Sequence, residues 1–83
     1  MKAKKFYVTY RTTTVTPSPI GAPQFIEVPR AIECPDEHSM MECARDIYSY
    51  DGIDNLRINK CGRLAKGTTV HSYEDYLAGK FGL

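Results

Sequence analysis

The stretch that decides the fold is residues 5–15, which read KFYVTYRTTTV. Three side chains alternate along it and would share one face of an extended strand: Phe6, Val8 and Tyr10. Three others would share the opposite face: Tyr7, Thr9 and Arg11. Because this alternation has the period of a strand, and β-branched and aromatic residues favour strands, the stretch predicts a β-strand.

A second strand follows after an exposed loop. Residues 16–24, TPSPIGAPQ, contain three prolines, and these lack the N–H groups that a sheet requires, so we expect a Pro-rich hairpin loop. Residues 25–33 resume the strand pattern, and Pro29 requires an edge position or a bulge. The two strands are therefore expected to form a hairpin with a long tip.

A helix follows the second strand. Pro35 suits the first helical position, and Asp36 and Glu37 favour the positive end of the helix dipole in the first turn. Five residues recur at helical spacing and would form the buried face: Met40, Cys43, Ala44, Ile47 and Tyr48. We expect the helix to end at Asp51-Gly52, because glycine adopts a positive φ readily.

The remaining elements complete an α+β fold. Leu56 and Ile58 alternate with polar residues in a third strand, and residues 68–70 favour a short fourth strand. Ser72 and Asp75 have the spacing of a capping box at the start of a short C-terminal helix. We predict a small, mainly antiparallel sheet in strand-strand-helix-strand order, with one helix packed on one face.

Length and composition bound the class of protein. A chain of 83 residues makes a single domain, residues 1–83, in which residues 62–83 form a C-terminal appendage. No apolar run approaches the ~20 residues that a membrane span needs, and the N-terminus has no signal-peptide core. Three cysteines without a Cys-x-x-Cys pair favour free thiols in a reducing compartment. We therefore expect a cytoplasmic protein without a membrane contact.

No set of residues predicts metal binding or catalysis. Four soft ligands lack the closely spaced pairs that are typical of a zinc site: Cys34, His38, Cys43 and Cys61. Cys34 would lie near a helix N-terminus, but Glu33 and Asp36 oppose formation of its thiolate. We expect no catalytic residue, no metal and no cofactor, and hence a protein that is not an enzyme.

Charge is strongly segregated along the chain. Seven of the ten carboxylates lie between Glu33 and Asp54, where Arg45 is the only lysine or arginine. Residues 1–15 and 56–66 are basic and contain no acid. We expect the acids on the helix and its flanks, the bases on the strands and the turn beyond, and the two groups on opposite faces. Segregated charge of this kind steers charged partners onto a surface.

Two binding modes follow from this layout. A basic and aromatic sheet face could neutralise phosphates and stack bases, and its members would be Tyr7, Tyr10, Arg11 and Arg57. An acidic strip on the exposed helix face could occupy a channel lined by basic residues, and its members would be Glu37, Glu42 and Asp46. The first mode predicts a small nucleic-acid-binding module, and the second predicts a protein partner.

Several short strings resemble the small phage-encoded inhibitors of bacterial RNA polymerase. These strings span residues 4–61 and are Lys4-Lys5-Phe6, Glu27-Val28-Pro29, Ala44…Tyr48…Gly52, and a strand with Arg57 and Cys61. The resemblance implies that the third strand presents basic side chains to an acidic polymerase surface, so Arg57 would inherit that role. The family's second basic position, two residues on, holds Asn59 here. The strand-strand-helix-strand plan is also similar to small anti-CRISPR proteins.

The leading hypothesis is therefore a non-enzymatic, phage-type inhibitor that acts in the bacterial host cytoplasm. It would block a host nucleic-acid machine by protein–protein contact, with RNA polymerase as first target and a CRISPR effector complex as second. The basic contact would use Arg57, Lys60 and Arg63, and the acidic contact would use Glu37, Glu42 and Asp46. We expect a monomer or a weak dimer. The small nucleic-acid-binding module is the alternative.

Overall fold

The computed structural model describes residues 5–82, so Lys2 and Lys4 of the basic N-terminal stretch lie outside the described residues. Its elements follow the predicted α+β plan: β1 (Phe6–Thr16), β2 (Gln24–Cys34), α1 (Glu37–Ile47), β3 (Ile53–Asn59), β4 (Thr69–His71) and α2 (Tyr73–Leu77). Within these residues, neither helix is long and apolar enough to cross a membrane.

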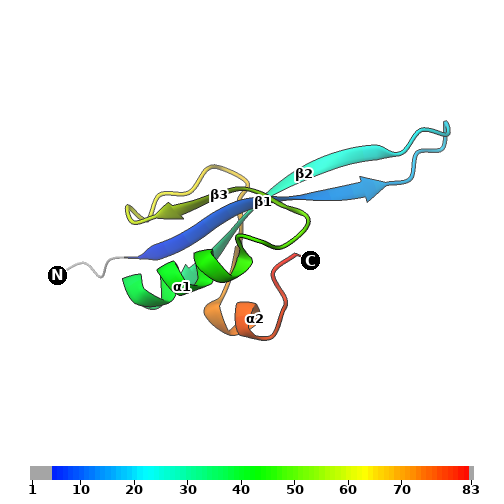
Figure 1. Cartoon of the computed structure of the whole chain (residues 1–83). Helices are drawn as coiled ribbons and strands as arrows, with labels where there is room; N and C mark the ends of the chain where they lie inside the picture. Colours follow the sequence, from blue (N-terminus) through cyan, green and yellow to red (C-terminus); the bar gives the residue numbers. More distant parts are fainter. Residues whose placement is uncertain (1–4, 83) are drawn as a thin grey trace.

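The four strands form one mixed sheet with the order β3-β1-β2-β4. β1 pairs antiparallel with both β2 and β3, whereas β4 runs parallel to β2. The sheet is thus mostly antiparallel, as expected. α1 lies across one face, and α2 lies on the same side (Figure 1). Pro29 sits just before Arg30, where β4 begins to pair with β2, so it occupies the part of β2 that is an edge.

The core lies between this face of the sheet and α1. It is built from buried side chains of three sources: Val8, Tyr10, Ile32 and Cys34 of the sheet, Met40, Cys43 and Ile47 of α1, and Phe81 near the C-terminus. The predicted alternation in β1 is confirmed, because Val8 and Tyr10 are 0% and 2% exposed on the helix side. Full burial of a side chain such as Ile47 stabilises the fold by about 1.5–3 kcal/mol.

α1 begins two residues later than the sequence predicts. The Asp36 carboxylate accepts a hydrogen bond from the Ser39 N–H at 2.7 Å, so Asp36 is the N-cap and Pro35 precedes the helix. This hydrogen bond lowers the pKa of Asp36. At the other end α1 stops at Ile47, and Tyr48 is 77% exposed. Tyr48 therefore does not belong to the buried face on which the spacing placed it.

The C-terminal residues are packed into the main body of the fold, meaning the sheet with α1 and α2, rather than forming an appendage. β4 extends the sheet, and the Tyr10 hydroxyl donates a buried hydrogen bond of 2.7 Å to the Phe81 carbonyl. The Ser72 hydroxyl accepts from the Asp75 N–H and caps α2, which confirms the predicted capping residue. Leu77 is 68% exposed, so Tyr73 and Tyr76 form the packed face of α2.

The long hairpin extends well beyond this body. β3 covers the edge of β1 only as far as Thr12, and the remaining residues 13–16 pair with β2 alone. This two-stranded projection, residues 13–27, is called the arm below (Figure 1). It gives the molecule extents of 53 × 25 × 19 Å.

A candidate arginine groove on the open face of the sheet

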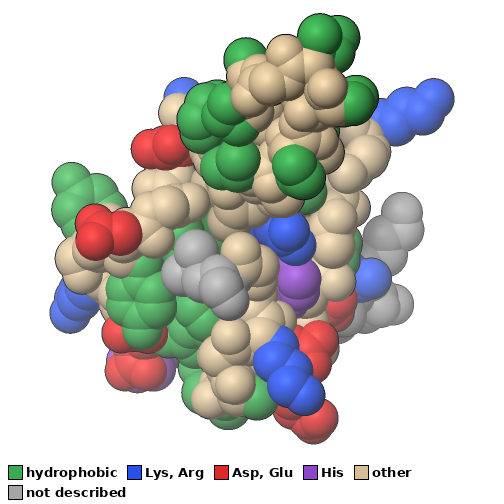
Figure 2. Space-filling view, turned by 90° about the vertical axis from the view of Figure 1, so that its right-hand side faces the viewer, with side chains coloured by type: hydrophobic (Ala, Val, Ile, Leu, Met, Phe, Trp, Pro, Cys, Tyr) green, Lys and Arg blue, Asp and Glu red, His purple; other side chains and the backbone are tan. Residues whose placement is uncertain are grey.

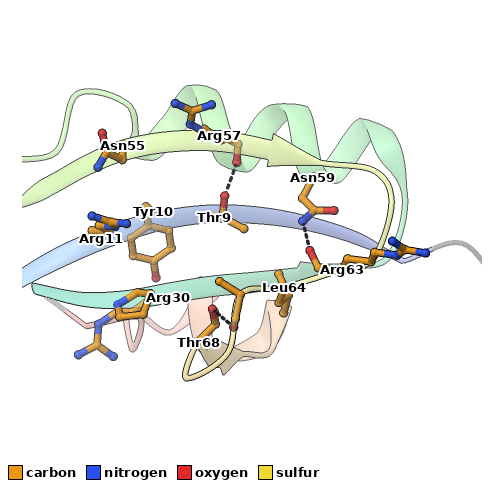
Figure 3. Close-up of a pocket in the computed structure, with 12 residues that line it drawn as sticks. Thr9, Tyr10, Arg11, Arg30, Asn55, Arg57, Asn59, Arg63, Leu64 and Thr68 are labelled. Atoms are coloured by element: carbon orange, nitrogen blue, oxygen red, sulfur yellow. Dashed lines mark hydrogen bonds between the residues drawn. The ribbon is translucent and has the colours of Figure 1, made fainter.

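The sheet face opposite α1, called the open face below, carries a groove. After β3 the chain crosses this face through residues 60–68 to reach β4 on the far edge (Figures 1 and 3). Between this crossing segment and strands β1 and β3 lies a cavity of about 390 Å³. All charged residues that line it are arginines: Arg11, Arg30, Arg57 and Arg63. We call it the arginine groove.

A bulge shapes the β3 side of the arginine groove. Thr9 is paired with Arg57 and Arg11 with Asp54, so two residues of β3, Asn55 and Leu56, oppose one residue of β1. Asn55 has a φ of 54°, a left-handed conformation that asparagine tolerates better than most residues. The bulge turns Asn55 toward the groove, where Figure 3 shows it above the β1 residues.

Asn59 holds the start of the crossing segment. Its side-chain oxygen accepts from the N–H groups of Cys61 and Gly62 at 3.1 and 3.0 Å, and its amide donates to the Arg63 carbonyl. Gly62 has a φ of 76°, which this turn requires. Asn59 thus fixes the turn that brings Arg63 to the rim of the arginine groove (Figure 3).

Two of the four arginines are engaged by other residues. Arg11 Nη1 donates to Glu27 Oε2 at 3.1 Å, with both side chains about half exposed, so the pair adds little stability. Arg30 Nε donates to Thr12 Oγ1 at 2.6 Å, and its Nη1 lies 3.1 Å from His71 Nε2. Because Thr12 belongs to the helix side, the Arg30 guanidinium points away from the groove.

Arg57 and Arg63 therefore supply the free basic groups of the arginine groove. Both residues are exposed, and no hydrogen bond or ion pair of their guanidinium groups is found in the described chain. The Arg57 backbone is fixed, because its carbonyl accepts from the Thr9 hydroxyl at 3.3 Å. In Figure 3 the Arg57 guanidinium lies beyond β3, on the side away from β1, and the Arg63 side chain extends outward from the turn, so the two groups flank the groove.

Lys60, the third predicted basic residue, lies elsewhere. Its Nζ forms an ion pair of 2.7 Å with Glu37 Oε1 at the start of α1. Side chains alternate between faces along an extended chain, so Lys60 points toward the helix while Arg57 and Asn59 face the groove. The expectation that basic and acidic residues lie on opposite faces is therefore wrong at this end of the sheet, where the two groups meet.

The predicted acidic strip is interrupted by intramolecular partners. Glu42 Oε1 lies 3.0 Å from Nε2 of His38, one helical turn away, and Asp46 accepts a hydrogen bond of 2.6 Å from the Tyr76 hydroxyl. Burial and this bond raise the pKa of Tyr76, so its hydroxyl stays protonated and joins α2 to α1. With Glu37 paired to Lys60, every member of the strip has a contact within the chain.

The aromatic part of the predicted nucleic-acid face is absent from the surface. Tyr7 and Tyr10 are only 5% and 2% exposed. Tyr10 packs against Phe81 on the helix side, and its burial raises its pKa. Tyr7 lies on the open face but is enclosed, and its strand partner Asn59 begins the crossing segment that covers this face. Neither ring is free to stack on a base, whereas Arg11 and Arg57 remain accessible.

The cysteines are free thiols in this structure. Cys34 and Cys43 are buried in the core, and Cys61 is exposed in the turn held by Asn59. The hydrogen bond with Cys34, together with burial, raises the pKa of Cys43. Among residues 5–82, no three side chains of the metal-binding types come together.

Comparisons of the chain with protein-family models, with curated proteins and with solved structures found no match. The site therefore has to be interpreted from its own geometry. Sequence reasoning named Arg57 and Arg63 but missed the role of Asn59, whose spacing to Cys61 and Gly62 is that of an Asx turn. It also missed the contact of Arg30 with Thr12 and His71, which depends on the pairing of distant strands.

Proposed function

We propose that this chain is a non-enzymatic, phage-type inhibitor that binds an acidic surface of a host nucleic-acid machine through the arginine groove. The target proposed first is bacterial RNA polymerase, and the second is a CRISPR effector complex. The observation that carries the proposal is an open groove whose charged lining residues are all arginines, two of them with unengaged guanidinium groups. Arginine suits this role because its planar donors bind carboxylates in a bidentate manner.

The chemistry of the arginine groove favours recognition over catalysis. Its polar lining residues other than arginine are threonines, asparagines and Tyr10, whose hydroxyl is bonded to the Phe81 carbonyl, and no carboxylate, histidine or cysteine lines it. A general acid or base with a pKa near neutrality is therefore lacking among the lining residues. What the groove offers is a set of donors for an anionic surface.

The resemblance to polymerase inhibitors supports the same contact with one change of residue. That family presents two basic side chains from its third strand, and here the second position holds Asn59. Asn59 instead binds the Arg63 carbonyl and brings Arg63 to the rim of the groove. We propose that Arg57 and Arg63 together take the role of the family's two basic residues.

Direct nucleic-acid binding is the weaker candidate. Arg57 and Arg63 could contact phosphates, but Tyr7 and Tyr10 are buried and cannot stack on bases. The acidic residues on the opposite side of the domain would also repel a second phosphate backbone. A structured acidic protein surface fits the arginine groove better, because two separated guanidinium groups require carboxylates at a fixed spacing.

The test uses purified RNA polymerase, a purified CRISPR effector complex, and duplex and single-stranded DNA as four separate titrants. The charge reversal Arg57→Glu with Arg63→Glu is expected to weaken binding to polymerase at least about tenfold, because a charge-assisted hydrogen bond contributes about 1.5–3 kcal/mol. The matched control Arg45→Glu with Lys80→Glu changes net charge equally at two exposed sites outside the groove, and should bind like the wild type.

Three results decide the proposal. Binding to polymerase that the groove variant loses and the control retains supports it, and wild-type binding should weaken as salt rises. The same pattern with the effector complex alone would select the second target. Tight binding to DNA without binding to either protein complex would overturn the proposal in favour of the nucleic-acid module.

A further inference from the structure

The arm is the part of the molecule that neither the core nor the arginine groove explains. Residues 12–26 contain no charged side chain. Four large apolar residues of the arm are exposed: Val15 at 54%, Ile20 at 92%, Phe25 at 69% and Ile26 at 48%. Figure 2 looks toward this end of the molecule and shows hydrophobic side chains gathered over it. A two-stranded ribbon is marginal in water by itself, so exposed apolar residues at this density indicate a contact surface.

The two edges of the arm differ in their protection. Two features along the β2 edge of the arm oppose pairing with another strand, Pro23 and Glu27, and Pro29 follows just beyond the arm. The β1 edge at residues 13–16 reads TTVT, without proline, glycine or charge. Within residues 5–82, β3 covers this edge only up to Thr12. Uncharged β-branched residues on an uncovered edge are the pattern that pairs with another strand.

We propose that two copies of this chain dimerise by antiparallel pairing of their β1 edges, with the two-fold axis at Val15. In antiparallel pairing, the side chains directly opposite each other point to the same face. Within one copy Val15 is opposite Phe25. The dimer would therefore carry a continuous apolar row across four strands, from Phe25 and Val15 of one copy to Val15 and Phe25 of the second copy.

The chemistry of the arm favours this occupant over others. Nucleic acid would need cations, and residues 12–26 contain none. A second copy meets an uncharged edge with an uncharged edge, so no repulsion or unpaired charge opposes the contact. The row about Val15 is also complementary to itself, which a two-fold dimer requires.

The proposed dimer leaves the arginine groove accessible. Thr9, which pairs with Arg57, lies six residues before Val15 in β1, or about 20 Å along an extended strand. A dimer would thus present two separate arginine grooves. The dimer proposal does not depend on the proposed function, because its test measures only the mass of the protein itself.

The test is sedimentation equilibrium of the full chain from about 1 to 300 µM, a range that brackets a micromolar Kd. The wild type is expected to reach the dimer mass within this range. Val15→Lys places a charge in the middle of the proposed interface and should leave a monomer throughout. Ile20→Lys is the matched control, since it adds the same charge to an exposed apolar position of the arm that lies outside the paired edge.

Both variants are expected to fold, because both positions are exposed and outside the core. Circular dichroism checks this. A dimer that Val15→Lys abolishes and Ile20→Lys retains supports the proposal. A wild type that stays monomeric up to about 300 µM would overturn it, as would loss of the dimer in Ile20→Lys or assembly into larger species. Larger species would indicate open, repeated edge pairing instead of a closed pair.

Discussion

The two halves of the β1–β2 hairpin differ in how many neighbouring elements cover them and in how deeply their side chains are buried. In the body, residues 7–12 of β1 have a neighbouring strand on each side and α1 on one face, and four of these six residues are buried. In the arm, residues 13–16 of the same strand have one neighbour and are all exposed. The local sequence is β-forming throughout. Strand propensity therefore explains why the β1–β2 hairpin is continuous, whereas the elements that cover it, β3 and α1, determine which part of it is stable.

This difference assigns separate roles to the two halves. The body holds the core and positions the arginine groove, whereas the arm adds little to the core and offers apolar contacts. Functional surfaces are commonly built from elements of low local stability that are anchored on a stable scaffold.

The sharpest comparison uses two isoleucines of β2. Ile32 is 0% exposed in the body, and Ile26 is 48% exposed in the arm on the same face of the strand. Ile32→Ala is expected to lower the free energy of unfolding by about 2–5 kcal/mol, because it leaves a cavity in the core. Ile26→Ala should lower it by less than about 1 kcal/mol. Urea denaturation measures both, and similar losses would contradict the division.

The body should also depend on the hydrogen bond between β1 and the C-terminal residues. Tyr10→Phe removes the hydroxyl that donates to the Phe81 carbonyl and leaves that buried acceptor without a partner. The expected loss is about 1–3 kcal/mol in the free energy of unfolding. Tyr48→Phe is the control, since the Tyr48 ring is 77% exposed. This variant should unfold at the same urea concentration as the wild type. An equal loss in both variants would contradict the role of the C-terminal residues in the core.

A smaller effect on stability, but a clear effect on binding, is expected at Asn59. Asn59→Ala removes the hydrogen bonds that hold the turn before Arg63. The free energy of unfolding should fall by about 1 kcal/mol, since two of these three bonds are solvent-exposed. Binding to the target of the arginine groove should weaken without any change of charge. Unchanged binding would show that the turn does not position Arg63.

The smallest effect concerns pH. Burial and the neighbouring charge of Arg30 lower the pKa of His71 from its ordinary value of 6.5, and Asp75 partly opposes this shift. The folded state therefore favours neutral His71, so its contribution is complete above pH 6.5 and declines as pH falls below that value toward the folded pKa. Between pH 7 and 5, the urea midpoint of the wild type should fall more than that of His71→Gln. Urea midpoints that fall equally with pH in the wild type and in His71→Gln would contradict this role of His71.

Local chemistry explains why much of the fold follows from the sequence. The alternation in β1, the prolines of the hairpin loop and the Ser72 cap each act over a few residues, so the sequence alone predicts them. The predicted start of α1 is wrong by two residues, and the reason is local. Both Pro35 and Asp36 favour a helix start, and only the hydrogen bond to Ser39 identifies Asp36 as the cap. Predictions that depend on one element alone were accurate to within a few residues.

Long-range contacts explain what the sequence could not give. That Lys60 points away from the face of Arg57 follows from strand alternation, but its ion pair with Glu37 depends on where the helix start lies relative to the turn, 23 positions away. The sequence predicts that Tyr7 is exposed, because it does not show that a segment more than fifty residues later crosses the sheet face on which Tyr7 lies. Arg57 and Arg63 were identified from charge, but the groove between them exists only because residues 60–68 traverse the sheet.

Hydrogen exchange of the full chain, measured at about 5 and 300 µM, tests the division between body and arm most directly. The amides of residues 7–12 should be protected to the same extent at both concentrations. Those of residues 13–16 should exchange fast at the lower concentration and gain protection at the higher one. Protection of the arm equal to that of the body at both concentrations would contradict the account.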